Sequence, residues 1–419
     1  MNAAPAPRGT GAPSGRLAGY RRVFRNRRFG WFFLAQATGD AGYAVYAIAV
    51  PWLALRISGS LAVAGVVLGV EFGVYALSFL AGPVVDRLRD LRTVLLLGYP
   101  AQGALALGMG FLAATGALSV PVLLVLVVAI SGVWTFTWTA SNAAPPGIVG
   151  ADDLFAANGL LSAVSGGNQL AGYAAGAAAI LLVGPAEGLV LYGFLNLAAA
   201  AFSLPVRVPQ SETPGGWYEG LRDGFREFVR PDGRPLVSLA VTSAIEGFAG
   251  AGPVLLILAV ANGAPSGGSR TYGILFTAFA LGTIVGSIVL GSANPRRRLG
   301  DLLLGATAVE GGLVIAAVLA EPLGASAAPI WFGVGALDVV FYQVALVYLQ
   351  ATSAPGLVGR TITNAYLFRG SGRALGAVAF GVALGVLPVL TTGVVDGLGL
   401  LGIAGAAALG APALRRLSF

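Results

Sequence analysis

Three polar residues stand close together in the first long apolar segment of the chain. Gln36, Asp40 and Tyr43 recur at i, i+4 and i+7, so they share one face of a helix. Asp40 lies deep within this segment, where a carboxylate costs roughly 3 kcal/mol on membrane-insertion scales and more in simulations. A residue this costly predicts a functional site, and we expect the three side chains to line a pathway through a membrane.

Other apolar segments carry further charges at similar depth: Glu71, Glu246, Glu310, Asp338, Arg369 and Arg373. A carboxylate in hydrocarbon without a cation tends to bind a proton, so this excess of acid is typical of a proton relay. We expect Asp40 to be the primary proton acceptor, with Glu71 or Glu246 as the second group. Asp40 and Glu71 could share one proton as a coupled pair.

Arg369 and Arg373 are one helical turn apart and share a face. Asp338 lies in the preceding apolar segment and is the natural ion-pair partner for them. Two roles stay open for the arginines: they could bind an anionic group of a substrate, or they could simply neutralise Asp338.

Aromatic side chains accompany these charges. Trp134 and Trp138 share a helix face, Tyr75 follows Glu71 by one turn, and Tyr342 follows Asp338 by one turn. Flat rings beside a few polar groups suit a bulky amphipathic solute. The alternative is that the tryptophans face lipid or the membrane interface.

The composition identifies the environment of these residues. Hydrophobic residues make up 56% of the 419 residues and charged residues 10%, with a mean hydropathy of +0.82. A soluble domain carries about 25% charged residues, so the chain is expected to be an integral membrane protein. The absence of Cys and His excludes disulfides, thiolate chemistry and His-based metal sites. No nucleophile and base assemble, so we expect neither an enzyme nor a cofactor.

Twelve segments are long enough to cross ~30 Å of hydrocarbon. They are predicted at residues 29–54, 61–85, 93–115, 119–141, 159–183, 188–206, 236–260, 272–292, 299–320, 327–350, 361–386 and 389–412. An even number of spans places both termini on the same side.

Arginine is distributed unequally between the two sides. The loops and termini on one side carry 21 arginines, and the opposite side carries only Arg56 and Arg270. The positive-inside rule therefore predicts cytoplasmic termini. The lack of Lys beside abundant Ala and Gly is typical of a GC-rich bacterial genome, so we expect a bacterial inner membrane. Topology and anionic headgroups explain the pI near 10, and no nucleic-acid partner is expected.

The predicted domains are a disordered basic tail (1–28), two six-span halves (29–206 and 236–413) and a short tail (414–419). Residues 207–235 link the halves. Within this linker, 215–230 (GGWYEGLRDGFREFVR) is predicted to form an amphipathic helix on the cytoplasmic surface, or alternatively a solvated linker helix. Two similar halves are typical of a duplicated transporter bundle. Gly172 and Gly176, four residues apart, predict close helix packing.

The loop after the second span reads Gly82-Pro-Val-Val-Asp86-Arg87-Leu-Arg89-Asp-Leu-Arg92. It resembles the loop signature of the major facilitator superfamily, with Arg89 where that family usually has Gly. The resemblance implies an all-α fold of 12 transmembrane helices in two pseudo-symmetric six-helix bundles. It also implies that Gly82, Asp86, Arg87 and Arg92 form a conformational latch.

The stretches 141–162, 218–236, 272–291 and 349–364 look like the third drug:proton antiporter branch, which includes macrolide and enterobactin exporters. Two features depart from what is usual in antiporters of this superfamily: the fourth span has no Arg, and Tyr173 stands where their fifth-span motif has Pro. Spans 1, 4, 7 and 10 line the cavity in this superfamily. The resemblance therefore favours Asp40, Glu246 and Asp338 as pathway groups and Glu310 as a structural acid.

Together these features predict a monomeric secondary transporter. We expect proton-coupled antiport to export a small amphipathic organic solute such as a drug, a natural product or a siderophore-like molecule. The expected partners are this solute, protons and membrane lipids. Proton-coupled import, uncoupled facilitation, lipid flipping through Arg369 and Arg373, and a non-transporting binding or sensing module are the alternatives.

Overall fold

The structure, a computed structural model, describes most of the chain. The described residues are 16–85, 88–150, 153, 157, 160–161, 184–209, 236–263, 268–293, 298–352, 358–410, 415 and 417. Within these ranges the regular elements are helices, and the one isolated β-bridge joins Asp90 to Pro209. The expected all-α membrane fold is confirmed.

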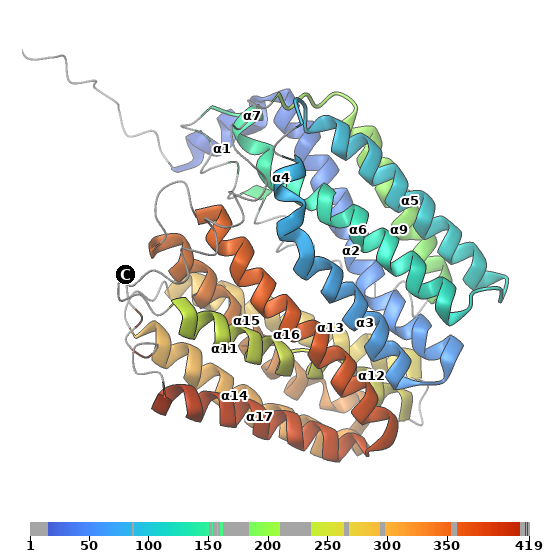
Figure 1. The fold of residues 1–419 in the computed structure, drawn as a ribbon, viewed down its shortest axis with the longest axis vertical. Coiled ribbons are helices and arrows are strands. Elements are labelled where there is room, and N and C mark those ends of the chain that lie inside the picture. Colours follow the sequence, from blue (N-terminus) through green and yellow to red (C-terminus); the bar gives the residue numbers. More distant parts are fainter. Residues whose placement is uncertain are drawn as a thin grey trace, which may run out of the picture.

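The first half of the chain forms the upper bundle in Figure 1. Its helices are α1 (Arg16–Arg25), α2 (Arg27–Ser58), α3 (Leu61–Ala76), η1 (Leu77–Leu80), α4 (Gly82–Val85), α5 (Arg92–Ala114), α6 (Val120–Ala143), α7 (Pro145–Ile148) and α9 (Pro185–Ser203).

The second half forms the lower bundle in the same view. Its helices are α11 (Leu236–Ala249), α12 (Gly252–Gly263), α13 (Gly268–Ala293), α14 (Leu299–Leu319), η3 (Glu321–Ala327), α15 (Ala328–Thr352), α16 (Val358–Val386) and α17 (Val389–Gly410).

Ten helical segments of the described chain are long and apolar enough to cross a membrane, and α11 with α12 counts as one of them. They match ten of the twelve predicted spans. The eleventh predicted span is α16, which is 29 residues long but carries Arg369 and Arg373. The span predicted at 159–183 lies almost wholly outside the described residues.

Local signals set the ends of the first span. The side chain of Asn26 accepts hydrogen bonds from the backbone N–H groups of Arg28 and Phe29, which caps the start of α2. Gly59 ends the helix with a φ of 65°, a left-handed conformation that glycine adopts without steric cost. Ser60 then caps α3 by accepting from the N–H of Val63.

The outer surface is strongly apolar. Large hydrophobic side chains are exposed on several helices, including Leu97, Phe111, Val125, Val386 and Leu409. Many exposed apolar side chains on long apolar helices are typical of contact with lipid.

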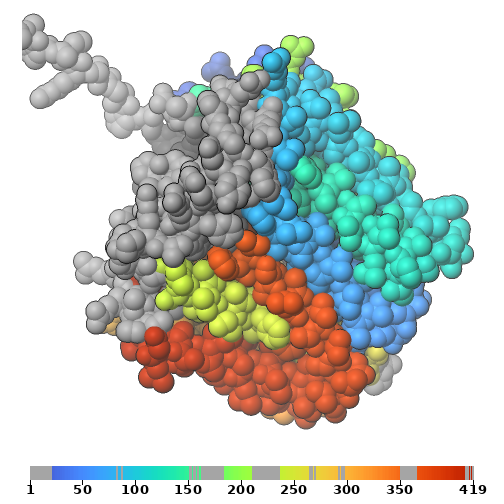
Figure 2. Space-filling view, in the orientation of Figure 1, coloured from blue at the N-terminus to red at the C-terminus, as the bar shows by residue number. Residues whose placement is uncertain are grey.

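The two halves meet along α3 and α16, which run side by side at the seam in Figures 1 and 2. Glycine makes this close approach possible. A Cβ on Gly65 would collide with the carbonyl oxygen of Ala377 and the Cα of Gly381. Small residues four apart allow backbones to touch in this way. Trp52 of α2 also stacks on Tyr272 of α13, with ring centroids 5.1 Å apart.

The apolar cores show how the halves are joined. One cluster contains the second half of α2, all but the ends of α12, and residues of α15 and α16, so it spans both halves. A second cluster, with Phe29 and Leu95, lies within the first half alone. A third, with Leu236 and Leu303, lies within the second half alone. The halves therefore share a core at one end of the spans and keep separate cores at the other.

One domain prediction is wrong in part. Residues 1–28 were expected to be disordered, but Arg16–Arg25 forms α1. Val23 is buried in the core of the first half, and Arg22 pairs with Asp153 at 3.1 Å. The apolar contact of Val23 holds this helix against the bundle. The predicted linker helix at 215–230 lies outside the described residues.

Candidate functional site

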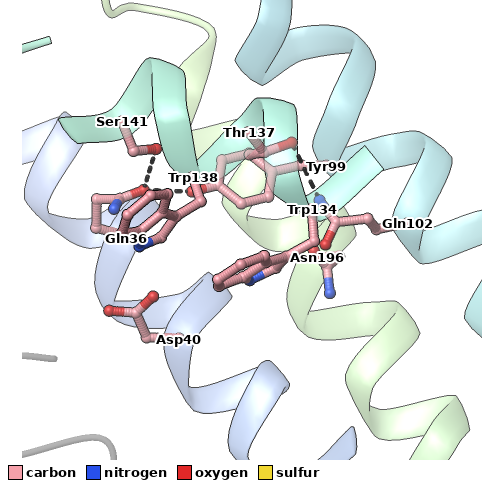
Figure 3. Close-up of a pocket in the computed structure, with 10 residues that line it drawn as sticks. Gln36, Asp40, Tyr99, Gln102, Trp134, Thr137, Trp138, Ser141 and Asn196 are labelled. Carbon is pink, nitrogen blue, oxygen red and sulfur yellow. Dashed lines mark hydrogen bonds between the residues drawn. The ribbon is translucent and has the colours of Figure 1, made fainter. Parts of the chain in front are cut away.

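A pocket opens between α2, α5, α6 and α9 of the first half (Figure 3). It is lined by Gln36, Gly39, Asp40, Tyr99, Gln102, Trp134, Thr137, Trp138, Ser141 and Asn196. Four of these residues were predicted from the sequence as cavity residues: Gln36, Asp40, Trp134 and Trp138. The structure brings them together from two helices, α2 and α6.

Gln36 anchors a polar network on one wall of the pocket. Its amide oxygen accepts hydrogen bonds from the hydroxyl of Tyr99 at 2.5 Å and from that of Ser141 at 2.8 Å. These bonds tie α2 to α5 and α6 and fix the orientation of the Gln36 side chain. Asp40, one turn further along α2, lies at the edge of the same pocket.

A second network surrounds Gln102, which is buried. Its amide nitrogen donates to the Thr137 hydroxyl at 3.2 Å, and its amide oxygen accepts from the Tyr192 hydroxyl at 3.0 Å. Buried polar groups are stabilised only when they are hydrogen-bonded, and this arrangement satisfies the amide on both sides. The pocket wall is therefore pre-organised.

Aromatic rings form the rest of the site. Trp134 stacks on Trp138 with centroids 5.8 Å apart, and it also contacts Tyr43 at 5.4 Å and Tyr75 at 4.4 Å. Trp138 reaches the second half, where its ring lies 6.0 Å from that of Tyr366 on α16. The tryptophans therefore face the interior, and the alternative of a lipid-facing position for them is wrong.

Glu71 is 1% exposed and belongs to a tyrosine cage. Its Oε1 accepts hydrogen bonds from the hydroxyls of Tyr75 at 3.0 Å and Tyr43 at 3.3 Å. The sequence suggested a shared proton between Asp40 and Glu71, and in the structure Glu71 accepts hydrogen bonds from these two tyrosines. Tyr43 thus connects the aromatic wall to the buried acid.

In the second half, Glu246 of α11 and Arg369 of α16 form a two-pronged ion pair. The distances are 2.8 Å from Nε to Oε2 and 3.0 Å from Nη2 to Oε1, and Glu246 is 2% exposed. The hydrogen bonds of Arg369 thus go to Glu246, which the sequence did not predict, and the predicted partner Asp338 interacts with Arg369 electrostatically. The closeness of spans 10 and 11 in sequence suggested Asp338, but the packing of α11 against α16 brings Glu246 within hydrogen-bond distance.

The two arginines face different surroundings. The Arg369 guanidinium also lies 5.5 Å from the ring centre of Tyr342, a predicted cavity residue. The Arg373 guanidinium lies 4.9 Å from the ring centre of Phe72 on α3, so it contacts the opposite half. Arg373 interacts electrostatically with both Glu71 and Glu246. A positive charge therefore stands between the buried acids of the two halves.

Several polar residues of these sites were missed in the sequence. Tyr99, Gln102 and Asn196 each interrupt an apolar span, which was the signal that could have found them. Asp396, which is 2% exposed within α17, carried the same signal as Asp40. Asp90 accepts hydrogen bonds from the N–H groups of Arg92 and Val208, so it ties the loop after α4 to the end of α9.

The predicted latch is described only at its ends. Gly82 begins α4 and Arg92 begins α5. Asp86 and Arg87 lie outside the described residues, as do Gly172 and Gly176 of the predicted packing motif.

Comparison with known proteins agrees with this architecture. Residues 20–415 match the family described as "Transmembrane secretion effector". No curated protein matches the chain.

Solved transporters share the fold at low sequence identity. A bacterial homologue of the human lysosomal transporter Spinster, in an inward-facing and unoccupied conformation, is 16% identical with a TM-score of 0.68, covering 96% of this chain and 97% of that one. The nucleoside transporter NupG is 12% identical with a TM-score of 0.68, covering 90% and 98%. A bacterial homologue of the iron transporter ferroportin, in an inward-facing state, is 16% identical with a TM-score of 0.63, covering 90% and 98%.

The family match spans nearly the whole chain, and the helical bundles are those of major facilitator transporters. The chain belongs to the transmembrane secretion effector family and is a multi-pass membrane transporter of the major facilitator type.

Proposed function

We propose that the protein exports a small amphipathic organic solute, such as a drug, a natural product or a siderophore-like molecule, in exchange for protons. The observation that carries this proposal is the pocket in which Asp40 and Gln36 meet Trp134 and Trp138. A few fixed polar groups beside flat apolar rings suit a solute with an aromatic or apolar body and a polar group. The family description, a secretion effector, favours the outward direction.

The arrangement of the cores supports a mechanism of alternating access. The shared cluster closes the end that contains the second half of α2, whereas the separate clusters leave the halves independent at the end where α2 begins. We propose that this second end faces the cytoplasm, in a bacterial inner membrane, because the positive-inside rule favours the cytoplasm for the arginine-rich side. We propose that the structure is the inward-facing state, which is also the state named for two of the similar transporters. The 82–92 loop would latch the opposite, outward-facing state.

Proton coupling would use the buried carboxylates of the first half. Asp40 would accept the proton from the pocket, and Glu71 would be the second group. Glu246 is a poorer second group in this state because Arg369 already occupies both of its oxygens. Buried acids in a transporter interior are a recurring feature of proton relays.

The test is transport by Asp40→Asn in proteoliposomes. A thermal-shift screen of amphipathic compounds on the wild-type protein first selects the probe. We expect the variant to keep its thermal shift with the probe, because Asn has the shape of Asp and Trp134 and Trp138 remain. We expect transport driven by a pH gradient to fall to the level measured without a gradient, because Asn cannot carry the proton.

The matched control is Glu187→Gln, which neutralises an exposed carboxylate at the start of α9 and should transport normally. Gradient-driven transport by Asp40→Asn at the wild-type rate would show that Asp40 has no role in proton coupling. Equal wild-type rates with and without a gradient would instead identify an uncoupled facilitator. Accumulation in the direction of the proton flux would identify an importer.

A further inference from the structure

The seventh span is interrupted in its middle. The α11 helix ends at Ala249 and α12 begins at Gly252, in the sequence Gly250-Ala251-Gly252-Pro253. Pro253 has no N–H to donate to the preceding turn, and its ring clashes with the carbonyl four residues earlier. The break is therefore built into the sequence, and it leaves the backbone of two glycines open to side chains from other helices.

Carboxylates from three spans converge on this break. Built onto Gly250, a Cβ would lie 3.5 Å from Oε1 of Glu246 and 3.6 Å from Oδ1 of Asp338. The Asp396 carboxylate lies directly against Gly252, in the space that a Cβ there would need. The absence of side chains at these two glycines thus makes room for the acids.

Most of this negative charge has no hydrogen-bonded cation. Glu246 is paired with Arg369. Among the described residues, Oδ1 of Asp338 and both oxygens of Asp396 are buried without a hydrogen-bond partner, at 9% and 2% exposure of the residues. Glu310 of α14 interacts electrostatically with Asp338, Glu246 and Asp396, which links the acids into one group.

Charged and titratable groups from five helices lie around the break. The titratable and charged groups around it are Glu246 on α11, Glu310 on α14, Asp338 and Tyr342 on α15, Arg369 and Arg373 on α16, and Asp396 on α17. If all ionised, the four acids would outnumber the two arginines, and Arg373 is turned toward Phe72 in the other half. Uncompensated charge is costly in an apolar interior, so the group must bind a positive charge.

We infer that the break in the seventh span is a proton-binding site, in which Asp396 is the carboxylate that takes up the proton and Asp338 lines the same break. A metal ion is a poorer occupant, because the described chain contains no cluster of three acidic, His or Cys residues arranged to hold one. Interrupted helices recur as sites for coupling ions in transporters, because their free backbone groups and side chains meet at mid-membrane.

The position of the break gives this proton a mechanical effect. The α12 side of the break belongs to the apolar cluster shared by both halves, and Leu236 and Leu239 of α11 belong to the cluster of the second half alone. Protonation would change the charge at the junction of two parts of this span. One part packs in the core shared with the first half, and the other packs in the core of the second half alone. The link to transport rests on the proposed exporter function, but proton binding at the break does not.

The test needs no transport substrate. Infrared difference spectra of the full-length protein in lipid nanodiscs, between alkaline and acidic potassium buffers, report the C=O stretch of protonated carboxyls. We expect the wild-type protein to show a buried carboxylic-acid band that grows on acidification. Asp396→Asn should remove part of this band, and Asp338→Asn should shift it, because a side chain that lines the same break has changed. Asp301→Asn, a control at an exposed ion pair with Arg415, should leave it unchanged.

Thermal unfolding measured on the same samples shows that each variant is folded. If Asp396→Asn does not fold, the Asp338→Asn spectrum decides the question alone. Folded variants with the wild-type band would overturn the proposal, and so would a band abolished by sodium in place of potassium, which would indicate a metal-ion site. Because substrate is absent, this outcome is separate from the Asp40→Asn transport result, and either proposal can fail alone.

Discussion

At the scale of single residues, the ion pair between Glu246 and Arg369 joins α11 to α16 through two hydrogen bonds. Both nitrogens of the fork are engaged, and the pair is nearly buried. Breaking a buried pair by removing one partner typically costs about 3–5 kcal/mol, because the remaining charge is left uncompensated. The pairing can therefore be tested through stability.

We expect Arg369→Met to lower the unfolding temperature strongly, by the loss of about 3–5 kcal/mol that an orphaned buried carboxylate costs. The double variant Arg369→Met/Glu246→Gln should recover most of this loss. Thermal unfolding in detergent measures both. The matched control is Arg369→Met/Asp338→Asn: a recovery as large as that with Glu246→Gln would show that Asp338 is the true partner.

This pair also shows what the sequence could and could not predict about residues. The presence and depth of Asp40, Glu246 and Arg369 followed from rare charges in apolar segments. Which acid meets which arginine did not follow, because partner choice depends on how α11 packs on α16 and not on distance along the chain. Gln102 and Asn196 were overlooked because uncharged amides disturb hydropathy less than charges do.

At the scale of the elements, the seam between α3 and α16 depends on glycine. Gly65 and Gly381 place the two backbones in contact, and Gly69 faces Val378 and the carbonyl oxygen of Ala374. Gly73 on the same helix faces only the Cβ of Ala374, at 3.9 Å. The tolerance for a side chain should therefore change along a single helix face.

We expect Gly65→Val to separate the helices, because overpacking a filled contact costs about 1–3 kcal/mol. The variant should unfold at a lower temperature than wild type, and Gly73→Ala, the control on the same face, should be close to wild type. Thermal unfolding of the purified proteins measures the difference. Equal unfolding temperatures for the two variants would contradict this tight seam.

The elements themselves were largely predictable. Spans such as 93–115 and 389–412 agree closely with α5 and α17, because long apolar runs between polar or glycine-containing turns have few other solutions. The interruption of the seventh span was not predicted, although Gly252-Pro253 is a recognised breaking signal. Strong hydropathy on both sides of the signal concealed it, since a broken span is as apolar as a continuous one.

At the scale of the whole molecule, the separate cores at one end are consistent with the proposed alternating access. Trp52 on Tyr272 lies at the closed end, and the starts of α2 and α11 belong to different cores at the other. Because the chain has no Cys, single and paired labels can be introduced without removing native thiols.

We expect spin-label pairs to move in opposite directions on probe binding or acidification. A pair at Arg28 and Leu302, on the outside of the separate cores, should shorten as the proposed cytoplasmic side closes. A pair at Ser58 and Asn262, at the shared end, should lengthen. Pulsed electron–electron distance measurements in nanodiscs check both, and movement of the two pairs in the same direction would contradict alternating access.

The contact of Arg373 with Phe72 has a consequence for such rocking. A hydrogen bond fixes both distance and angle, whereas the attraction between a guanidinium and a ring persists anywhere within about 6 Å of the ring centre. Here the separation is 4.9 Å, so the two helices can slide by a fraction of a turn without stripping this cation of its partner. The guanidinium of Arg373 would therefore keep its contact with the Phe72 ring while α3 and α16 move in the proposed transport cycle, and this buried charge would stay stabilised throughout.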